Sequence, residues 1–259
     1  MTHVRIRALL LGALFAFGIG CASSRPLVPP GTPQADQFLF ERGQQELKEK
    51  HWVAAREYFR QIVDNYPQST YRPDAKLAVG DTYIGEGSAE SLVLAENEFR
   101  EFLTFYPTSP RADYAQFRLA FAYSKQMLGA DRDQTATRET IKELQVFLDK
   151  YPNSSLMSDA RKLMRQAKDR LSDASFIVGN YYYRVKWYRG AIDRFREILK
   201  TDPEYTKRDA VYFLLAESLL KTNEKAEALP YYERLIKEFE QSEYLQDARR
   251  RVAELKTGT

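Results

Sequence analysis

Apolar residues recur every three to four positions along almost the whole chain from Phe38 onward, a period that predicts amphipathic helices. Turn-forming residues interrupt this pattern at intervals, and no stretch alternates apolar and polar residues cleanly enough to predict a strand. One run, from about 155 to about 186, contains no helix breaker and predicts a single long helix. We therefore expect an all-α protein.

The interruptions resemble one another. Four contain proline: "VDNYPQSTYRPDA" at 63–75, "LTFYPTSPRADYA" at 103–115, "LDKYPNSSLMSDA" at 148–160 and "LKTDPEYTKRDA" at 199–210. A fifth copy, "IKEFEQSEYLQDA" at 236–248, lacks it. Proline has no N–H to donate and disfavours helix in the residue before it, so each copy predicts the end of one helix and the start of the next.

A second spacing lies inside the repeated units. A small residue, an alanine, an aromatic residue and a proline follow one another at intervals of 12, 4 and 8, once at Gly43, Ala55, Phe59 and Pro67, and again at Gly179, Ala191, Phe195 and Pro203. This resembles the tetratricopeptide (TPR) signature, in which the small residue lets two helices approach and the aromatic ring fills the space between them. It predicts a right-handed α-solenoid of about five TPR-like helix-turn-helix repeats plus a C-terminal capping helix.

The predicted solenoid covers residues 37–256. Its units are expected at about 37–67, 70–107, 109–152, 155–203 and 207–240, with a closing helix at 242–256. The third unit has a longer connection between its helices, "GADRDQTATRE". In the fifth unit Glu240 replaces the proline and Pro230 falls within the second helix, which leaves that unit's geometry open.

The first twenty residues have the layout of a secretory signal. Two arginines precede thirteen uncharged residues, "ALLLGALFAFGIG", a run too short to span a bilayer comfortably. The run ends at Cys21, and "GIGC" resembles a bacterial lipobox, although Gly18 stands where leucine is usual. The resemblance implies cleavage before Cys21 and covalent N-acyl and S-diacylglycerol lipid on that residue. The alternative is a soluble secreted protein with an incidental cysteine.

The segment after Cys21 predicts a tether. Residues 22–36 contain four prolines and a glycine and lack helical periodicity, so 21–36 is expected to form a lipid anchor and an extended spacer. The residue after Cys21 is not aspartate, which in well-studied lipoproteins signals inner-membrane retention. The expected location is therefore the outer membrane.

Composition and motif content argue against several classes of function. The chain has 39 basic and 36 acidic residues, a net charge of +3, which does not favour a nucleic-acid partner. One cysteine permits no intramolecular disulfide and no cysteine-rich metal site. His51 is the only histidine after the signal, and no H-E-x-x-H, G-x-S-x-G or P-loop spacing occurs. We expect no enzyme activity, no metal site and no cofactor apart from the lipid on Cys21.

Two segments are candidate partner-binding sites. The third unit's loop clusters Asp131, Arg132, Asp133 and Gln134. As a calcium loop it fails where Ala136 replaces the required glycine. It is expected to be either a helix-capping loop or a contact surface.

The turn of the fourth unit interleaves cations and aromatic rings, with Arg184, Lys186, Trp187 and Arg189 as the candidate residues. Aromatic and arginine residues dominate interface hot spots, so this turn could hold an acidic or aromatic partner surface. In the alternative, Trp187 and Tyr188 only staple the turn.

The whole arrangement resembles one family. The segments "ADYAQFRLAFAYSKQ", "DRDQTATRETIKELQVFLDKYPNSSLMSDAR" and "FIVGNYYYRVKWYRGAIDRF", together with the lipobox, resemble the BamD (ComL-like) outer-membrane-assembly lipoproteins, from Cys21 to about Ala253. The resemblance implies a non-enzymatic scaffold on the periplasmic face of the outer membrane. It implies a BamA-type barrel subunit with periplasmic repeat domains as partner, with other assembly lipoproteins and unfolded outer-membrane proteins as further candidates. The alternative is a periplasmic TPR adaptor lipoprotein in envelope maintenance or cell division.

Overall fold

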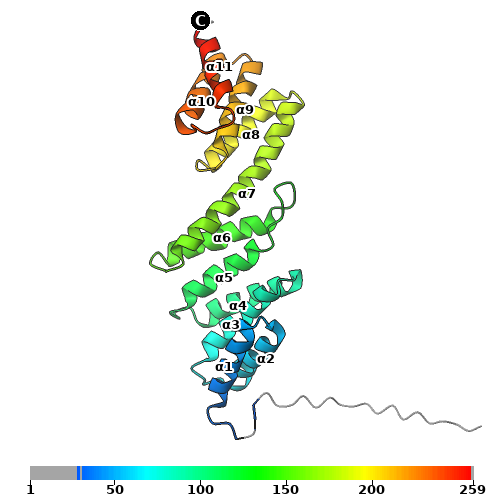
Figure 1. Cartoon of the computed structure of the whole chain (residues 1–259), viewed down its shortest axis with the longest axis vertical. Coiled ribbons are helices and arrows are strands. Elements are labelled where there is room, and N and C mark those ends of the chain that lie inside the picture. Colours follow the sequence, from blue (N-terminus) through cyan, green and yellow to red (C-terminus); the bar gives the residue numbers. More distant parts are fainter. Residues whose placement is uncertain (1–27, 30, 258–259) are drawn as a thin grey trace, which may run out of the picture.

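The computed structural model describes residues 28–29 and 31–257, and these form eleven α-helices with no strand among them (Figure 1). The helices are α1 (Ala35–Lys48), α2 (Trp52–Asn65), α3 (Arg72–Glu86), α4 (Ala89–Phe105), α5 (Ala112–Ser124), α6 (Thr135–Lys150), α7 (Met157–Arg184), α8 (Tyr188–Thr201), α9 (Arg208–Lys221), α10 (Lys225–Glu238) and α11 (Leu245–Thr257). The signal segment and Cys21 lie outside the described residues.

The helices stack in chain order into an elongated solenoid, with α1 at one end and α11 at the other (Figure 1). Each helix packs mainly on the one before it and the one after it, so α1 pairs with α2, α3 with α4, and so on to α9 with α10, while α11 covers the last pair. The prediction of an all-α TPR-like solenoid is confirmed.

The long helix predicted from about 155 to 186 is confirmed as α7, which has 28 residues. Its first half packs on α6 and its second half pairs with α8. Figure 1 shows it crossing obliquely between the lower and upper parts of the stack. Within the described residues, every substantial helix-to-helix contact between the two parts runs through α7.

Small residues and aromatic rings hold the first and fourth pairs together as the spacing predicts. A Cβ atom on Gly43 would lie 2.7 Å from Phe59 Cε1, and one on Gly179 would lie 2.7 Å from Phe195 Cε1. Both rings are fully buried. Only glycine permits the helices to approach this closely, because any side chain would occupy the position of the ring.

Three of the repeated joints share a hydrogen bond. Ser69 donates its Oγ hydrogen to Asp36 Oδ2 at 2.6 Å, which ties the end of the first pair to the first turn of α1. The same bond joins Ser154 to Asp113 at 2.6 Å and Ser242 to Asp209 at 2.7 Å. These three joints therefore do more than end a helix, because each also clamps the start of its own pair.

The fifth pair, whose geometry the sequence left open, follows the common plan. Pro230 lies inside α10 and does not end it, and Phe239 takes the cap position after the helix. Ala228 and Tyr232 are fully buried, as their place in the repeated spacing requires. The missing proline at Glu240 is therefore not needed to stop α10.

Candidate interaction surfaces

The first helices of the first three pairs line a hollow of about 420 Å³. Its lining residues are Phe40, Gln44, Leu47, Asp74, Leu77, Ala78, Asp81, Arg111 and Tyr114, from α1, α3 and the start of α5. We call this the N-terminal groove. None of these residues was predicted from the sequence. Helical spacing shows which residues share a face of a helix, but it does not show whether the neighbouring helices cover that face.

Charge in the N-terminal groove is partly neutralised. Arg118 Nε lies 2.7 Å from Asp81 Oδ1, and the Tyr114 hydroxyl donates to Asp81 Oδ2 at 2.8 Å. Burial raises the pKa of Asp81 although Arg118 opposes the shift. Arg111, whose side chain is half exposed, lies 3.4 Å from Asp74 and over the Tyr114 ring. The groove thus combines apolar walls with one accessible cation, which suits an extended or helical segment carrying aromatic and anionic groups.

The loop of the third unit divides its four candidate residues between two roles. Gln134 is only 5% exposed, and its amide donates to the carbonyl oxygens of Gly129 and Arg132 at 2.7 and 3.0 Å. Asp133 accepts from the backbone N–H of Thr135 at 2.9 Å, which lowers its pKa. Gln134 and Asp133 therefore build the loop and cap α6, whereas Asp131 and Arg132 are exposed and available for contact.

The turn of the fourth unit has an unusual surface. Lys186 adopts a left-handed conformation with φ 63°, and the Trp187 N–H donates to the Tyr182 carbonyl at 2.9 Å. The indole packs edge-on against Tyr182 with ring centroids 4.4 Å apart, yet Trp187 is 56% exposed. Trp187 therefore staples the turn and still presents its ring to a partner, so the two alternatives from the sequence are compatible.

The cations of this turn are unpaired. Arg184, Lys186 and Arg189 are exposed, and within the part of the chain that the structure describes their side chains make no hydrogen bond or ion pair. Exposed cations beside an exposed aromatic ring are typical of a protein interface. Partner binding by this turn and by the loop at 131–134 stays a prediction.

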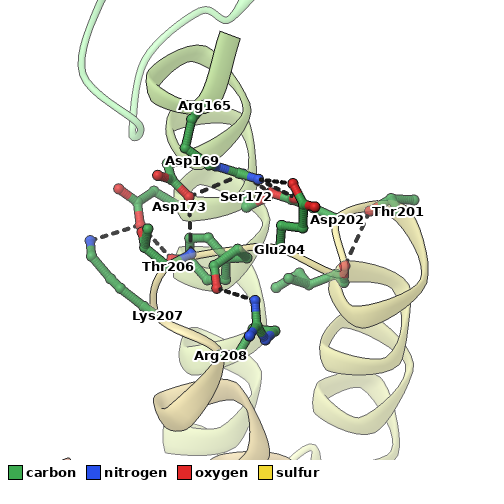
Figure 2. Close-up of polar contacts among 12 residues, drawn as sticks. Arg165, Asp169, Ser172, Asp173, Thr201, Asp202, Glu204, Thr206, Lys207 and Arg208 are labelled. Atoms are coloured by element: carbon green, nitrogen blue, oxygen red, sulfur yellow. Dashed lines mark hydrogen bonds and ion pairs between the residues drawn. The ribbon is translucent and has the colours of Figure 1, made fainter. Parts of the chain in front are cut away.

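A polar cluster that the sequence did not predict joins α7 to the connection between α8 and α9 (Figure 2). Arg165 on α7 holds Asp202 through two hydrogen bonds, one of 2.9 Å from Nη1, and Ser172 donates to Asp202 at 2.7 Å. On the other side of α7 in Figure 2, Asp173 accepts from Tyr205 and pairs with Lys207 at 2.8 Å. We call this the α7 junction.

One sequence signal could have revealed the α7 junction. Asp202 stands where the first three joints have Tyr66, Tyr106 and Tyr151, and it is only 6% exposed. Burial by itself would raise the pKa of Asp202, but hydrogen bonds from Arg165 and Ser172 outweigh it and hold the pKa below its usual value. The fourth joint is thus closed by charge where the others are closed by aromatic packing.

One group among the described residues has the composition of a metal site. Ligand atoms of Glu46, Glu49 and His51 lie within 4.8 Å of one another. His51 Nδ1 lies 2.8 Å from Glu46 Oε2 and 3.5 Å from Glu49 Oε2, so the same atoms already contact one another within the turn. Separately, none of the described helices is both long and apolar enough to cross a membrane.

Comparisons with known proteins agree with the fold. The TPR2AB domain of yeast Sti1, solved as a complex with pHSP90, has a TM-score of 0.51 to this chain at 14% identity, covering 86% of this chain and 83% of that one. At this identity the likeness shows the fold alone. Residues 210–242 also match the model of the tetratricopeptide repeat.

Relatives found by sequence indicate a narrower family than the fold does. The outer membrane protein assembly factor BamD of Caulobacter vibrioides is 28% identical over 226 residues, covering 87% of this chain and 72% of the relative. Its counterpart in Vibrio cholerae is 25% identical over 206 residues, covering 76% and 81%. The model of the family described as outer membrane lipoprotein, YfiO, matches residues 33–224. The chain therefore belongs to the YfiO family of outer membrane lipoproteins, to which the BamD resemblance of its sequence pointed.

Proposed function

We propose that the protein is a non-enzymatic scaffold subunit of the outer-membrane β-barrel assembly machine. Membership of the YfiO family and the likeness to BamD assembly factors over most of the chain are the observations that carry this proposal. Lipid on Cys21 would hold the chain on the periplasmic face of the outer membrane. More than one acyl chain is needed for this, because a single chain binds a membrane only marginally.

The two parts of the solenoid take separate roles in this proposal. The N-terminal groove receives segments of unfolded outer-membrane proteins, because it combines apolar walls with the accessible cation of Arg111. The fourth and fifth pairs dock on the periplasmic repeat domains of a BamA-type barrel subunit, and the unpaired cations around Trp187 support this assignment. A rigid solenoid can hold both partners at once because each pair contacts only its neighbours.

A mild-detergent pulldown on a C-terminally tagged chain, read by mass spectrometry, tests the proposal. Recovery of a large barrel protein with periplasmic repeat domains is the expected result. Recovery of peptidoglycan or division proteins alone would contradict it and would favour the envelope adaptor. A charge-reversal variant, Arg184→Glu with Arg189→Glu, should reduce recovery of the barrel protein without unfolding the chain.

The lipid anchor needs its own experiment. Cys21→Ala removes the proposed lipid attachment site, so this variant should leave the outer-membrane fraction and appear in the soluble fraction. Cys21→Ala protein that still fractionates with outer membranes would show that something other than this lipid holds the chain there.

A further inference from the structure

Exposed apolar side chains gather on the second half of α7. Ten large apolar residues are exposed among those described, and six of them belong to this region: Leu128, Ile177, Val178, Tyr181, Val185 and Trp187. We call these six residues the α7 stripe. The other four are distributed over α2 and α4, so only the α7 stripe forms a concentration of exposed apolar surface.

The α7 stripe is continuous along one face of the helix. Ile177, Tyr181 and Val185 follow one another at intervals of four residues, which places them one above the other. Arg170, about two turns before Ile177 on the same face, donates to the Leu128 carbonyl at 2.5 Å. This bond brings the loop of the third unit to the lower end of the stripe, and Trp187 lies at its upper end.

Charge surrounds the upper end of the stripe asymmetrically. Arg184, Lys186 and Arg189 are exposed there, with no side-chain partner within residues 28–29 and 31–257. A partner that covers Tyr181 and Trp187 must also face these cations. Carboxylates bordering an apolar surface would satisfy both requirements, whereas a second copy of this chain would set cation against cation.

The backbone of this region limits how a partner can bind. Helices already satisfy their own backbone hydrogen bonds, so a partner strand finds no sheet edge to extend here. Side chains must supply the contact, and the regular ridges of a helix face accept another helix. From Arg170 to Val185 the face is about 22 Å long at 1.5 Å per residue, which matches a helix of about four turns.

We propose that the α7 stripe binds an amphipathic helix of another protein, one whose apolar face is bordered by Asp or Glu residues. The inference rests on the proposed scaffold function and names the chemistry of its docking partner. Because Leu128 belongs to the third unit and Trp187 to the fourth, the bound helix touches both parts of the solenoid. Docking would therefore link the loop of the third unit to the turn of the fourth.

Tryptophan fluorescence tests this directly, because Trp187 is one of only two tryptophans. In a Trp52→Phe background the purified chain is titrated with a synthetic 16-residue peptide that has Leu at helical spacing and Glu along both borders. A twin peptide carries Lys in place of Glu. We expect a saturable blue shift with the Glu peptide and at least tenfold weaker binding of the Lys peptide.

Variants locate the binding. Tyr181→Asp with Val185→Asp should weaken binding of the Glu peptide at least tenfold, since charge replaces apolar contact. Val53→Asp with Val93→Asp, which alters exposed valines outside the stripe, is the matched control and should change nothing. Circular dichroism confirms that each variant remains helical.

Three results would overturn the inference: no saturation by the Glu peptide up to 1 mM, equal binding of both peptides, or a shift only with vesicles containing anionic phospholipid. The last would identify the stripe as a lipid-facing surface. The proposed function is judged separately by the pulldown. Recovery of the barrel protein without peptide binding rejects the docking chemistry alone, and peptide binding without the barrel protein rejects the assembly role alone.

Discussion

The turns of the first and fourth helical pairs have the same backbone conformation but expose different side chains. Lys50 and Lys186 both adopt a left-handed conformation, with φ of 62° and 63°. In each turn the next residue donates its N–H to the carbonyl five residues earlier, at 2.9 Å. In the first pair His51 Nδ1 then lies 2.8 Å from Glu46 Oε2. In the fourth, Trp187 packs against Tyr182, and the neighbouring cations have no side-chain partner among the described residues.

The joints that follow these two pairs differ in the same manner. The first ends at Tyr66 and is clamped by the bond from Ser69 to Asp36. The fourth ends at Asp202, which is held by Arg165 and Ser172 of α7. The shared backbone therefore sets the fold, and the residues that differ between the two pairs change how each joint is closed and which side chains each turn exposes.

The largest expected loss of stability concerns the buried aromatic ring that both pairs contain. Phe59→Ala and Phe195→Ala each remove a fully buried ring packed on a glycine, so each should lower the free energy of unfolding by about 3–5 kcal/mol. Urea denaturation followed by circular dichroism measures both. A loss in one pair without a comparable loss in the other would show that the common plan does not carry equal stability.

The second largest loss of stability should distinguish the fourth joint from the first. Asp202→Ala leaves Arg165 without its main partner in a largely buried setting, which should cost about 3 kcal/mol. Ser69→Ala removes one hydrogen bond from the first joint and should cost only about 1 kcal/mol. The same denaturation measurement compares them, and equal losses would contradict the view that the fourth joint depends on charge.

Lowering the pH should weaken the fourth joint, because that joint depends on the charge of Asp202. The pKa of Asp202 is lowered on folding, so its contribution is fully present above the unfolded value near about 3.9 and is lost as pH falls through the lower folded value. Each unit of lowering corresponds to about 1.4 kcal/mol. The stability difference between the unmodified chain and Asp202→Asn should therefore shrink between pH 5 and pH 2. A difference independent of pH would exclude an ionised Asp202.

The smallest effect on stability is expected at the fourth turn itself. Arg184→Ser with Lys186→Ser removes two exposed cations that have no partner among the described residues, so the midpoint of thermal unfolding should not change measurably. In the first turn, Glu46→Gln removes the carboxylate that contacts His51 and pairs with Arg42, and should lower the midpoint slightly. A marked loss of stability from the fourth-turn variant would mean that its cations serve the fold.

Some of this protein could be predicted from the sequence because the relevant forces are local. Helical periodicity, the prolines at the joints and the spacing of Gly43, Ala55 and Phe59 act within a few turns of the chain. They predicted the all-α solenoid and the long α7. The fourth unit's turn was also found, because Trp187 and its neighbouring cations are contiguous in the sequence.

The tertiary structure decided which side chains the neighbouring pairs cover. Gln134 looked like a contact residue beside three charges, but the loop folds around its amide. Asp202 meets Arg165 from 37 positions away, which no local pattern announces. Leu47 lines the N-terminal groove and Tyr181 remains uncovered for the same reason, since exposure depends on the stacking of whole pairs. Sequence periodicity determined the helices, whereas the packing between them selected the surfaces open to partners.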